Sequence, residues 1–190
     1  MGMPNTAPPP WTREMVLALP DDGNRYELLD GELLVTPAPS AAHQWAVAAV
    51  FQRLIRYLDG TAIGFACTSP ADLRLEGGQI AQPDVFVVLP RPDGSRPARW
   101  EDFRIPLLVV EVLSSSTAPA DRITKRRRYQ RTGIPEYWVV DVAGRVIERW
   151  RPADDRPEII DQTLEWEPDP GHPPLVISLA EFFADVPGAD

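Results

Sequence analysis

Two stretches of the sequence are apolar on both faces of an extended chain, residues 82–89 (QPDVFVVL) and 105–113 (IPLLVVEVL). Strands of this kind lie in the middle of a sheet, where helices cover both faces. The segments around them alternate between strand and helix patterns, and no internal repeat is visible. The sequence therefore predicts an α/β (α+β) fold with a mixed central β-sheet flanked by helices.

Turn signals and apolar periodicity predict the other elements. Asp30 and Gly31 separate two short apolar runs, and they predict an N-terminal β-hairpin because both turn residues must reach positive φ. Ser40 predicts the start of a helix to residue 59, with Ile55 on its apolar face. We expect further helices at residues 11–19, about 119–132 and 179–184, and further strands at 62–67, 71–75, 136–142 and 145–151.

The length of 190 residues suits one domain with a sizeable core. Residues 1–10 are Pro-rich and read as a disordered tail, so the domain is expected to span residues 11–190. The single cysteine, Cys67, excludes an intramolecular disulfide and a zinc site made of thiolates. No apolar run reaches the roughly 20 residues of a membrane span, and residues 1–11 do not resemble a secretory signal. We therefore expect a cytoplasmic protein.

Charge is distributed unevenly along the chain. The net charge of -9 is carried by an acidic C-terminal extension, residues 152–190, which holds ten acids and one base. Residues 121–131 are strongly basic, with six bases and one acid. Overall acidity opposes binding to nucleic acid, whereas a local basic segment favours it. Of the 19 bases, only Lys125 is a lysine, so a reaction that needs an ammonium group has one candidate.

Two carboxylates interrupt the apolar strands. Asp84 opens the first strand, and Glu111 shares a face with Val109 and Leu113 in the second. An ionised carboxylate in such a layer is costly unless a cation meets it. If the strands are neighbours, Asp84 and Glu111 can converge on Mg²⁺, which takes one or two protein carboxylates and keeps several waters. The alternative is a separate structural partner for each acid, such as an arginine.

The basic helix carries a polar stripe. Asp121, Lys125 and Tyr129 are spaced i, i+4, i+8 and lie along one side of it. Because the helix follows the Glu111 strand after a short turn, Lys125 could reach the pocket of Asp84 and Glu111. The alternative is an ordinary Asp–Lys pair on a helix, worth about 0.3–0.5 kcal/mol.

Taken in order, these segments resemble the Uma (DUF820-like) family of restriction endonucleases, within the PD-(D/E)xK nuclease superfamily. The resemblance covers residues 11–184 and implies a restriction-endonuclease-like core. It rests on the segments 26–32 (YELLDGE), 83–85 (PDV), 110–114 (VEVLS) and 133–141 (GIPEYWVVD), on His43 at a helix start, and on the Asp121, Lys125 and Tyr129 stripe.

The resemblance implies a role for each candidate residue. Asp84 and Glu111 would bind Mg²⁺, or Mn²⁺ in its place, with the backbone carbonyl of Val112 as a further ligand. Residue 113 is Leu where the superfamily has Lys, and some relatives carry the lysine on the next helix, which assigns that role to Lys125. Ser115 stands where the family often has Pro.

Other superfamily members place a glutamate on the first core helix, which here has no acid before Asp59. Glu32 of the hairpin is a candidate substitute, and its alternative role is an exposed turn flank. His43 reads as a buried structural histidine that could support the site, as could Asp121 and Tyr129.

The function expected from this resemblance is a metal-dependent endonuclease acting on nucleic acid, with DNA as the expected substrate. A homodimer would supply two sites for cutting both strands. The alternative is a nucleic-acid-binding or regulatory protein that keeps a nuclease scaffold without turnover. A third reading makes the basic helix a solvated surface. In the first reading, phosphate contacts come from Arg122, Arg126, Arg127, Arg128 and Arg131.

Overall fold

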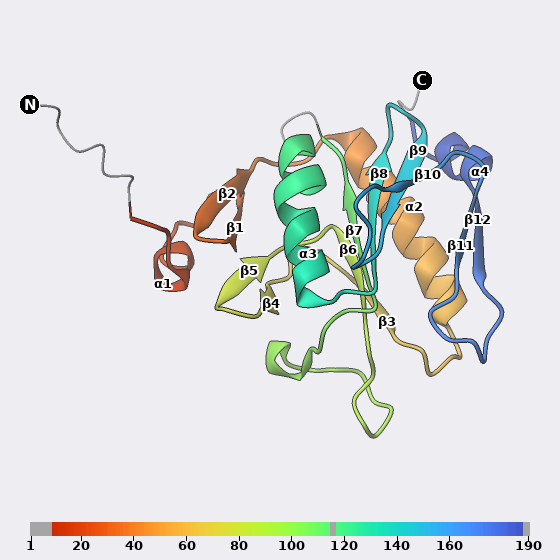
Figure 1. The fold of residues 1–190 in the computed structure, drawn as a ribbon, viewed down its shortest axis with the longest axis horizontal. Helices are drawn as coiled ribbons and strands as arrows, with labels where there is room; N and C mark the ends of the chain where they lie inside the picture. The colour runs from red at the N-terminus through yellow and green to blue at the C-terminus, as the bar shows by residue number, and fades with distance from the viewer. Residues whose placement is uncertain (1–8, 115–116, 188–190) are drawn as a thin grey trace, which may run out of the picture.

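A six-stranded mixed sheet forms the centre of the computed structural model, which describes residues 9–114 and 117–187 (Figure 1). Only β7 (Leu108–Val112) and β8 (Glu136–Asp141) run parallel, and each other neighbouring pair in this sheet is antiparallel. In sheet order the strands are β10 (Glu158–Ile160), β9 (Val146–Trp150), β8 (Glu136–Asp141), β7 (Leu108–Val112), β6 (Val85–Val88) and β3 (Phe65–Thr68).

Strands β6 and β7 are the two apolar runs identified in the sequence. They are antiparallel neighbours, and each of their residues is buried. Val85 and Val87 pack into the core on one face of the sheet, and Phe86 and Val88 pack into the core on the other. A strand with a core on both faces has no polar side, which explains its unbroken apolar sequence.

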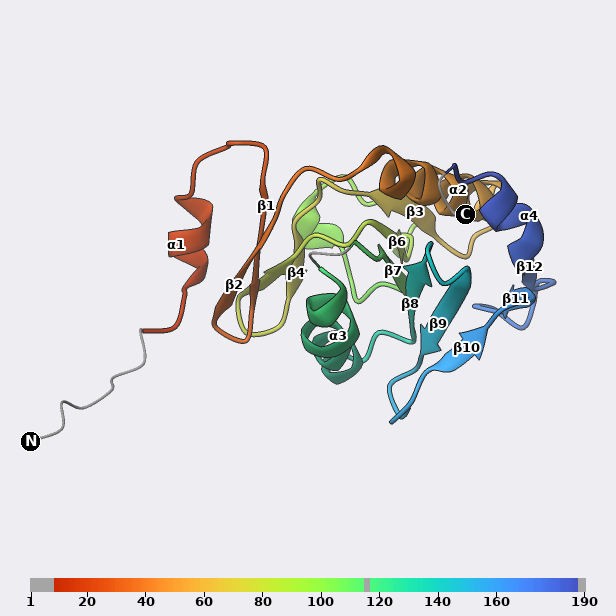
Figure 2. The ribbon, with the colours of Figure 1, turned by 90° about the horizontal axis from the view of Figure 1, so that it is seen from above.

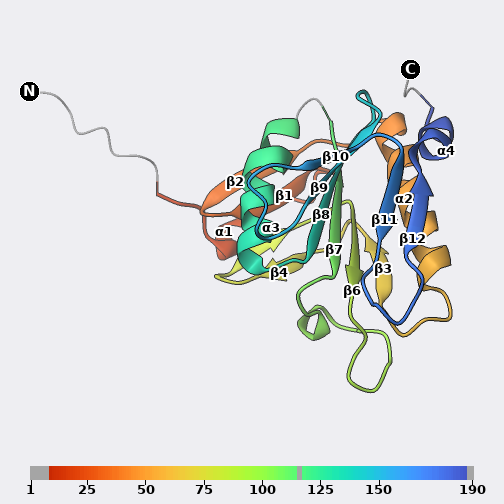
Figure 3. The ribbon, with the colours of Figure 1, turned by 45° about the vertical axis from the view of Figure 1, so that its right-hand side comes forward.

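One face of the sheet is covered by helix α2 (Ala41–Leu58), which begins at the Ser40 N-cap as predicted. Val50, Leu54 and Leu58 of the expected apolar face are buried, but Ile55 is 45% exposed, and Ala46 and Ala49 are buried in addition. The same layer holds the hairpin of β11 (Thr163–Trp166) and β12 (Leu175–Ser178) and the helix α4 (Leu179–Ala184) (Figure 3).

The opposite face is covered by a π-helical segment η2 (Ala120–Lys125), the helix α3 (Arg126–Thr132) and a four-stranded sheet (Figure 2). The predicted hairpin is present in that sheet, and its turn residues Asp30 and Gly31 have φ of 53° and 82°. In order, the sheet contains β2 (Glu32–Thr36), β1 (Arg25–Leu29), β5 (Gln79–Ala81) and β4 (Leu73–Leu75).

Two short helices complete the described chain, α1 (Arg13–Leu17) and the 3₁₀ turn η1 (Trp100–Asp102). The predicted mixed sheet with flanking helices is confirmed. Most of the predicted tail, residues 1–8, and the turn residues 115–116 lie outside the described residues. Within the described ranges, no helix is long and apolar enough to cross a membrane.

Candidate active site

The candidate site lies where β6 begins and β7 ends, at one end of the central sheet. Val85 pairs with Val110, so the next step of this antiparallel register places Asp84 opposite Glu111. Both carboxylates are buried, with 4% and 2% of their residue surface exposed. They line a common cavity of about 390 Å³. The predicted convergence of these two residues is therefore present in the fold.

Lys125 reaches the same cavity from η2. Its Nζ lies 3.0 Å from Glu111 Oε1, 2.9 Å from Glu27 Oε2 and 3.2 Å from Asp121 Oδ1. One turn further, Tyr129 donates a hydrogen bond of 3.0 Å from its hydroxyl to Glu111 Oε1. The polar stripe of the basic helix thus faces Glu111. Its Asp121–Lys125 pair is buried at the site, which differs from an ordinary pair on a helix surface.

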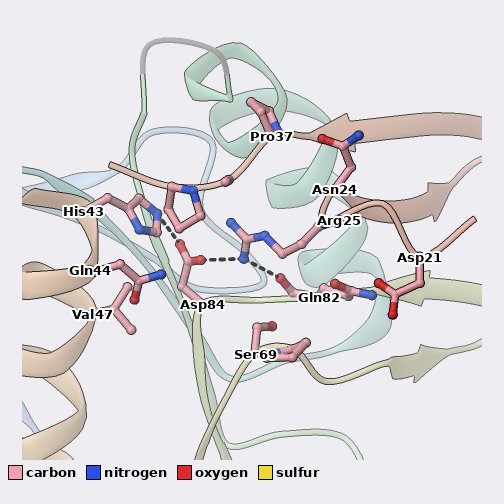
Figure 4. Close-up of a pocket in the computed structure, with 14 residues that line it drawn as sticks. Asp21, Asn24, Arg25, Pro37, His43, Gln44, Val47, Ser69, Gln82 and Asp84 are labelled. Carbon is pink, nitrogen blue, oxygen red and sulfur yellow. Dashed lines mark hydrogen bonds and ion pairs between the residues drawn. The ribbon is translucent and has the colours of Figure 1, made fainter. Parts of the chain in front are cut away.

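Asp84 has a separate set of partners. Its Oδ1 accepts a hydrogen bond of 2.7 Å from Arg25 Nη1, and its Oδ2 accepts one of 2.8 Å from the Val112 N–H. His43 Nε2 lies 3.1 Å from the same Oδ2 (Figure 4). The Arg25 contact matches the alternative in which each acid has a structural partner, whereas the partner of Glu111 is the lysine.

These surroundings shift the pKa values of the two carboxylates in opposite directions. Burial alone would raise the pKa of Asp84, but His43, Arg25 and the Val112 amide outweigh it and hold this pKa at about 2. Burial raises the pKa of Glu111 well above its usual range. Lys125 opposes that rise, while the nearby carboxylates Asp121, Asp84 and Glu27 add to it.

Carboxyl groups outnumber cationic groups in this cluster. Four buried carboxylates, those of Glu27, Asp84, Glu111 and Asp121, face the two cations Lys125 and Arg25. An added cation beside Asp84 and Glu111 would lower the repulsion. Among the described residues, including those of this cluster, no group of three or more Asp, Glu, His or Cys side chains is arranged to hold a metal ion. Asp84 and Glu111 supply two carboxylates, and Mg²⁺ typically takes one or two from a protein and keeps several waters.

Glu32, predicted as a candidate site residue, lies outside this cluster. It is exposed and lines an open groove of about 620 Å³ together with Arg127 and Arg131. The hairpin glutamate at the site is Glu27, which is 1% exposed and pairs with Lys125. Glu27 lies on the same face of β1 as the buried Leu29. An acid on the apolar face of a strand was therefore the signal that could have identified it.

Most of the predicted phosphate-binding arginines have partners within the protein. Arg122 pairs with Asp141 and Glu148, and the guanidinium of Arg126 lies 4.6 Å from the centre of the Trp150 ring. Of the remaining three, two contact Asp30 of the hairpin turn: Arg128 and Arg131. The groove lined by Arg127 and Arg131 shares no residue with the cavity of Asp84. None of these five arginines lines the cavity of Asp84 and Glu111, and their contact with phosphate stays a prediction.

The model of the Uma2 family, described as "Putative restriction endonuclease", matches residues 13–180. The chain belongs to the Uma2 family. Its fold also matches the crystal structure of "a putative nuclease belonging to DUF820" from Anabaena variabilis, with a TM-score of 0.69 and 22% identity over 93% of this chain and 99% of that chain. A comparison with curated proteins gave no match. Family membership confirms the resemblance found in the sequence and supports nuclease activity on nucleic acid in general.

Proposed function

We propose that this Uma2 protein is a metal-dependent endonuclease that hydrolyses phosphodiester bonds in DNA. The observation that carries the proposal is the convergence of Asp84, Glu111 and Lys125 on one cavity at the end of the central sheet. Their identities and order along the chain fit the PD-(D/E)xK pattern, with the lysine moved from residue 113 to η2.

The roles follow from the positions of the side chains. Asp84, Glu111 and the carbonyl of Val112 would hold Mg²⁺, or Mn²⁺ in its place, which supplies Lewis-acid stabilisation of the phosphate when bound. Lys125 keeps its charge: burial lowers its pKa, but Glu111, Glu27 and Asp121 raise it well above the usual range. An ammonium fixed beside the reacting phosphate stabilises the charge that develops there.

Three further residues hold these groups in place. Glu27 takes the position that the sequence assigned to Glu32, because its carboxylate orients Lys125. His43 orients Asp84 through its 3.1 Å contact. Arg25 also lines the cavity, and 20% of its side chain is exposed. Its guanidinium can therefore leave Asp84 and bind a phosphate oxygen of the substrate instead.

Cleavage of supercoiled plasmid in Mg²⁺ or Mn²⁺ tests the proposal. Asp84→Ala and Glu111→Gln should each lower the rate at least about 100-fold, because each removes a charged oxygen ligand. Asp161→Ala and Glu167→Gln are matched controls, since both acids are exposed and outside the cavity. Cleavage by Asp84→Ala at the rate of the unmodified protein would contradict the assignment.

A non-catalytic protein that binds nucleic acid is the second candidate. It is favoured by Leu113 at the usual lysine position and by the Arg25 guanidinium that already neutralises Asp84. Calorimetric titration with Mg²⁺ separates the two, because a scaffold without turnover has no need to bind metal through Asp84 and Glu111. The homodimer expected for cutting both strands of a duplex stays a prediction, which sedimentation can test.

A further inference from the structure

A second cavity, of about 380 Å³, lies directly beside the candidate site. Its wall includes Arg25, His43 and Asp84, which also line the site cavity. Figure 4 shows Asp84 between His43, Gln44 and Val47 from α2 on one side and Arg25 and Asn24 on the other. The two cavities therefore meet at the Arg25–Asp84 pair. If a phosphate group of a bound molecule lies beside Asp84 in the candidate site, the part of the molecule next to that phosphate lies at the entrance to the second cavity.

The lining of this second cavity combines apolar surfaces with uncharged polar groups. Val47, Pro39 and Pro70 supply the apolar part, and the polar part comes from the amides of Gln44 and Gln82. Gln44 is exposed, and throughout the described residues its side chain has no hydrogen bond of its own. Gln82 uses its Nε2 to bind Asp72, which leaves its Oε1 as an acceptor.

Charge in the cavity is concentrated at its junction with the site. Arg25 and Asp84 pair with each other there, and the wall also contains the carboxyl group of Asp21 and the imidazole of His43. The interior is therefore close to neutral and suits a flat group with apolar faces and polar edges. A nucleobase has this form, and side-chain amides bind base edges through paired donors and acceptors.

We propose that this cavity holds one unstacked nucleotide of the substrate, adjacent to the phosphodiester that lies at Asp84 and Glu111; this inference rests on the proposed function. The volume falls at the low end of the about 300–1,000 Å³ of small-ligand sites, which suits one nucleotide rather than a base pair.

A base must leave its stack to enter such a cavity. This step costs a few kcal/mol in a duplex and least where the base is already unpaired. The preferred substrate class is therefore single-stranded or locally unpaired nucleic acid, and continuous duplex is the poorer substrate.

Binding of a single-stranded oligonucleotide that contains 2-aminopurine tests this inference. The full-length protein is titrated in Ca²⁺, a hard cation that binds oxygen ligands as Mg²⁺ does. Binding should change the fluorescence of the base that enters the cavity, and a continuous duplex of the same sequence should bind about tenfold more weakly. A duplex that binds as tightly as the single strand would overturn the inference.

Two glutamines of α2 provide matched variants. Gln44→Trp fills the cavity and should weaken single-strand binding about tenfold, whereas Gln52→Trp, exposed on the same helix outside the cavity, should leave it unchanged. Thermal unfolding verifies that each variant folds. If the tryptophan disturbs the helix, Gln44→Ala is used in its place and should cause a smaller loss of single-strand binding. Equal affinities of the Gln44→Trp and Gln52→Trp variants for the single strand would contradict the proposal that a nucleotide binds in this cavity.

Cleavage is measured separately, so that the two proposals can fail independently. A protein that cleaves plasmid but leaves 2-aminopurine fluorescence unchanged keeps its proposed function and has no nucleotide in this cavity. A protein that shows the fluorescence change and the Gln44→Trp loss, yet cleaves no nucleic acid, keeps the cavity and lacks the hydrolytic function.

Discussion

At the scale of single residues, Lys125 is a buried cation surrounded by carboxylates. The residue is 3% exposed, and its ammonium lies within 3.2 Å of oxygens from Glu27, Glu111 and Asp121. A buried charge without a partner costs several kcal/mol. The lysine thus stabilises three carboxylates that would otherwise repel one another, in addition to its proposed role at the phosphate.

Lys125→Met should lower the free energy of unfolding by about 3–5 kcal/mol, because it leaves buried carboxylates unpaired. The loss should grow as pH rises. Glu111, whose pKa is raised on folding, contributes stability below its unfolded pKa and loses this contribution as pH rises through its folded pKa. Lys125 opposes that loss because its charge favours the ionised carboxylate, so the variant without it loses more stability at higher pH. Urea unfolding over a range of pH measures both effects. A loss below about 1 kcal/mol at every pH would contradict this account.

Residue-scale reasoning from the sequence succeeded where a charge interrupted an apolar pattern. Asp84 and Glu111 were found in this way, and Lys125 was found as the one lysine of the sequence, on the polar stripe of the basic helix. All three line the cavity. Glu27 carries the same signal, but the sequence analysis proposed Glu32 of the same hairpin. Which of the two faces Lys125 depends on how the hairpin packs on the sheet, and that packing joins residues distant in sequence.

At the scale of elements, the segment from η2 to α3 has two distinct faces. Asp121, Lys125 and Tyr129 are buried against the sheet, while Arg127 is exposed. The neighbouring arginines are held by acids far away in sequence, such as Asp30, 101 residues before Arg131. Sequence alone identifies a basic helix, but it does not reveal which charges are neutralised by such distant partners.

Arg127→Ala should weaken binding to nucleic acid and lower the slope of log K against log salt by about 1, because one phosphate contact is lost. Arg127 is the matched choice because, among the described residues, this arginine of α3 has no ion pair. Arg56→Ala is the control, since Arg56 is also exposed but lies on α2. Binding isotherms at several salt concentrations measure the slope. Equal slopes for both variants would show that α3 does not contact the substrate.

At the scale of the whole molecule, the acidic C-terminal extension is part of the core. Its strand β10 pairs with β9 at the edge of the central sheet, and Leu164, Trp166 and Phe182 pack with α2 and β8. Composition marked this segment as acidic, but it did not show that its apolar residues alternate with the acids. Alternation of this kind places the acids on the outside and the apolar residues against the sheet.

Deleting residues 152–190 should therefore abolish cooperative unfolding, because it exposes the apolar side of α2 and one edge of the central sheet. The double substitution Glu165→Gln with Glu167→Gln removes two exposed charges of the same segment and should leave the melting temperature almost unchanged. Differential scanning calorimetry measures both proteins. A truncated protein with a sharp transition at the original temperature would contradict this role of the segment.

The contact between α2 and α4 also determines when the protein can fold. Arg53 on α2 pairs with Asp185, 132 residues later, and Phe183 and Val186 complete the same core. A ribosome adds about 5–20 residues per second, and contacts between distant residues form slowly. One side of α2 therefore stays uncovered during synthesis, accessible to chaperones, until residues 182–186 have emerged.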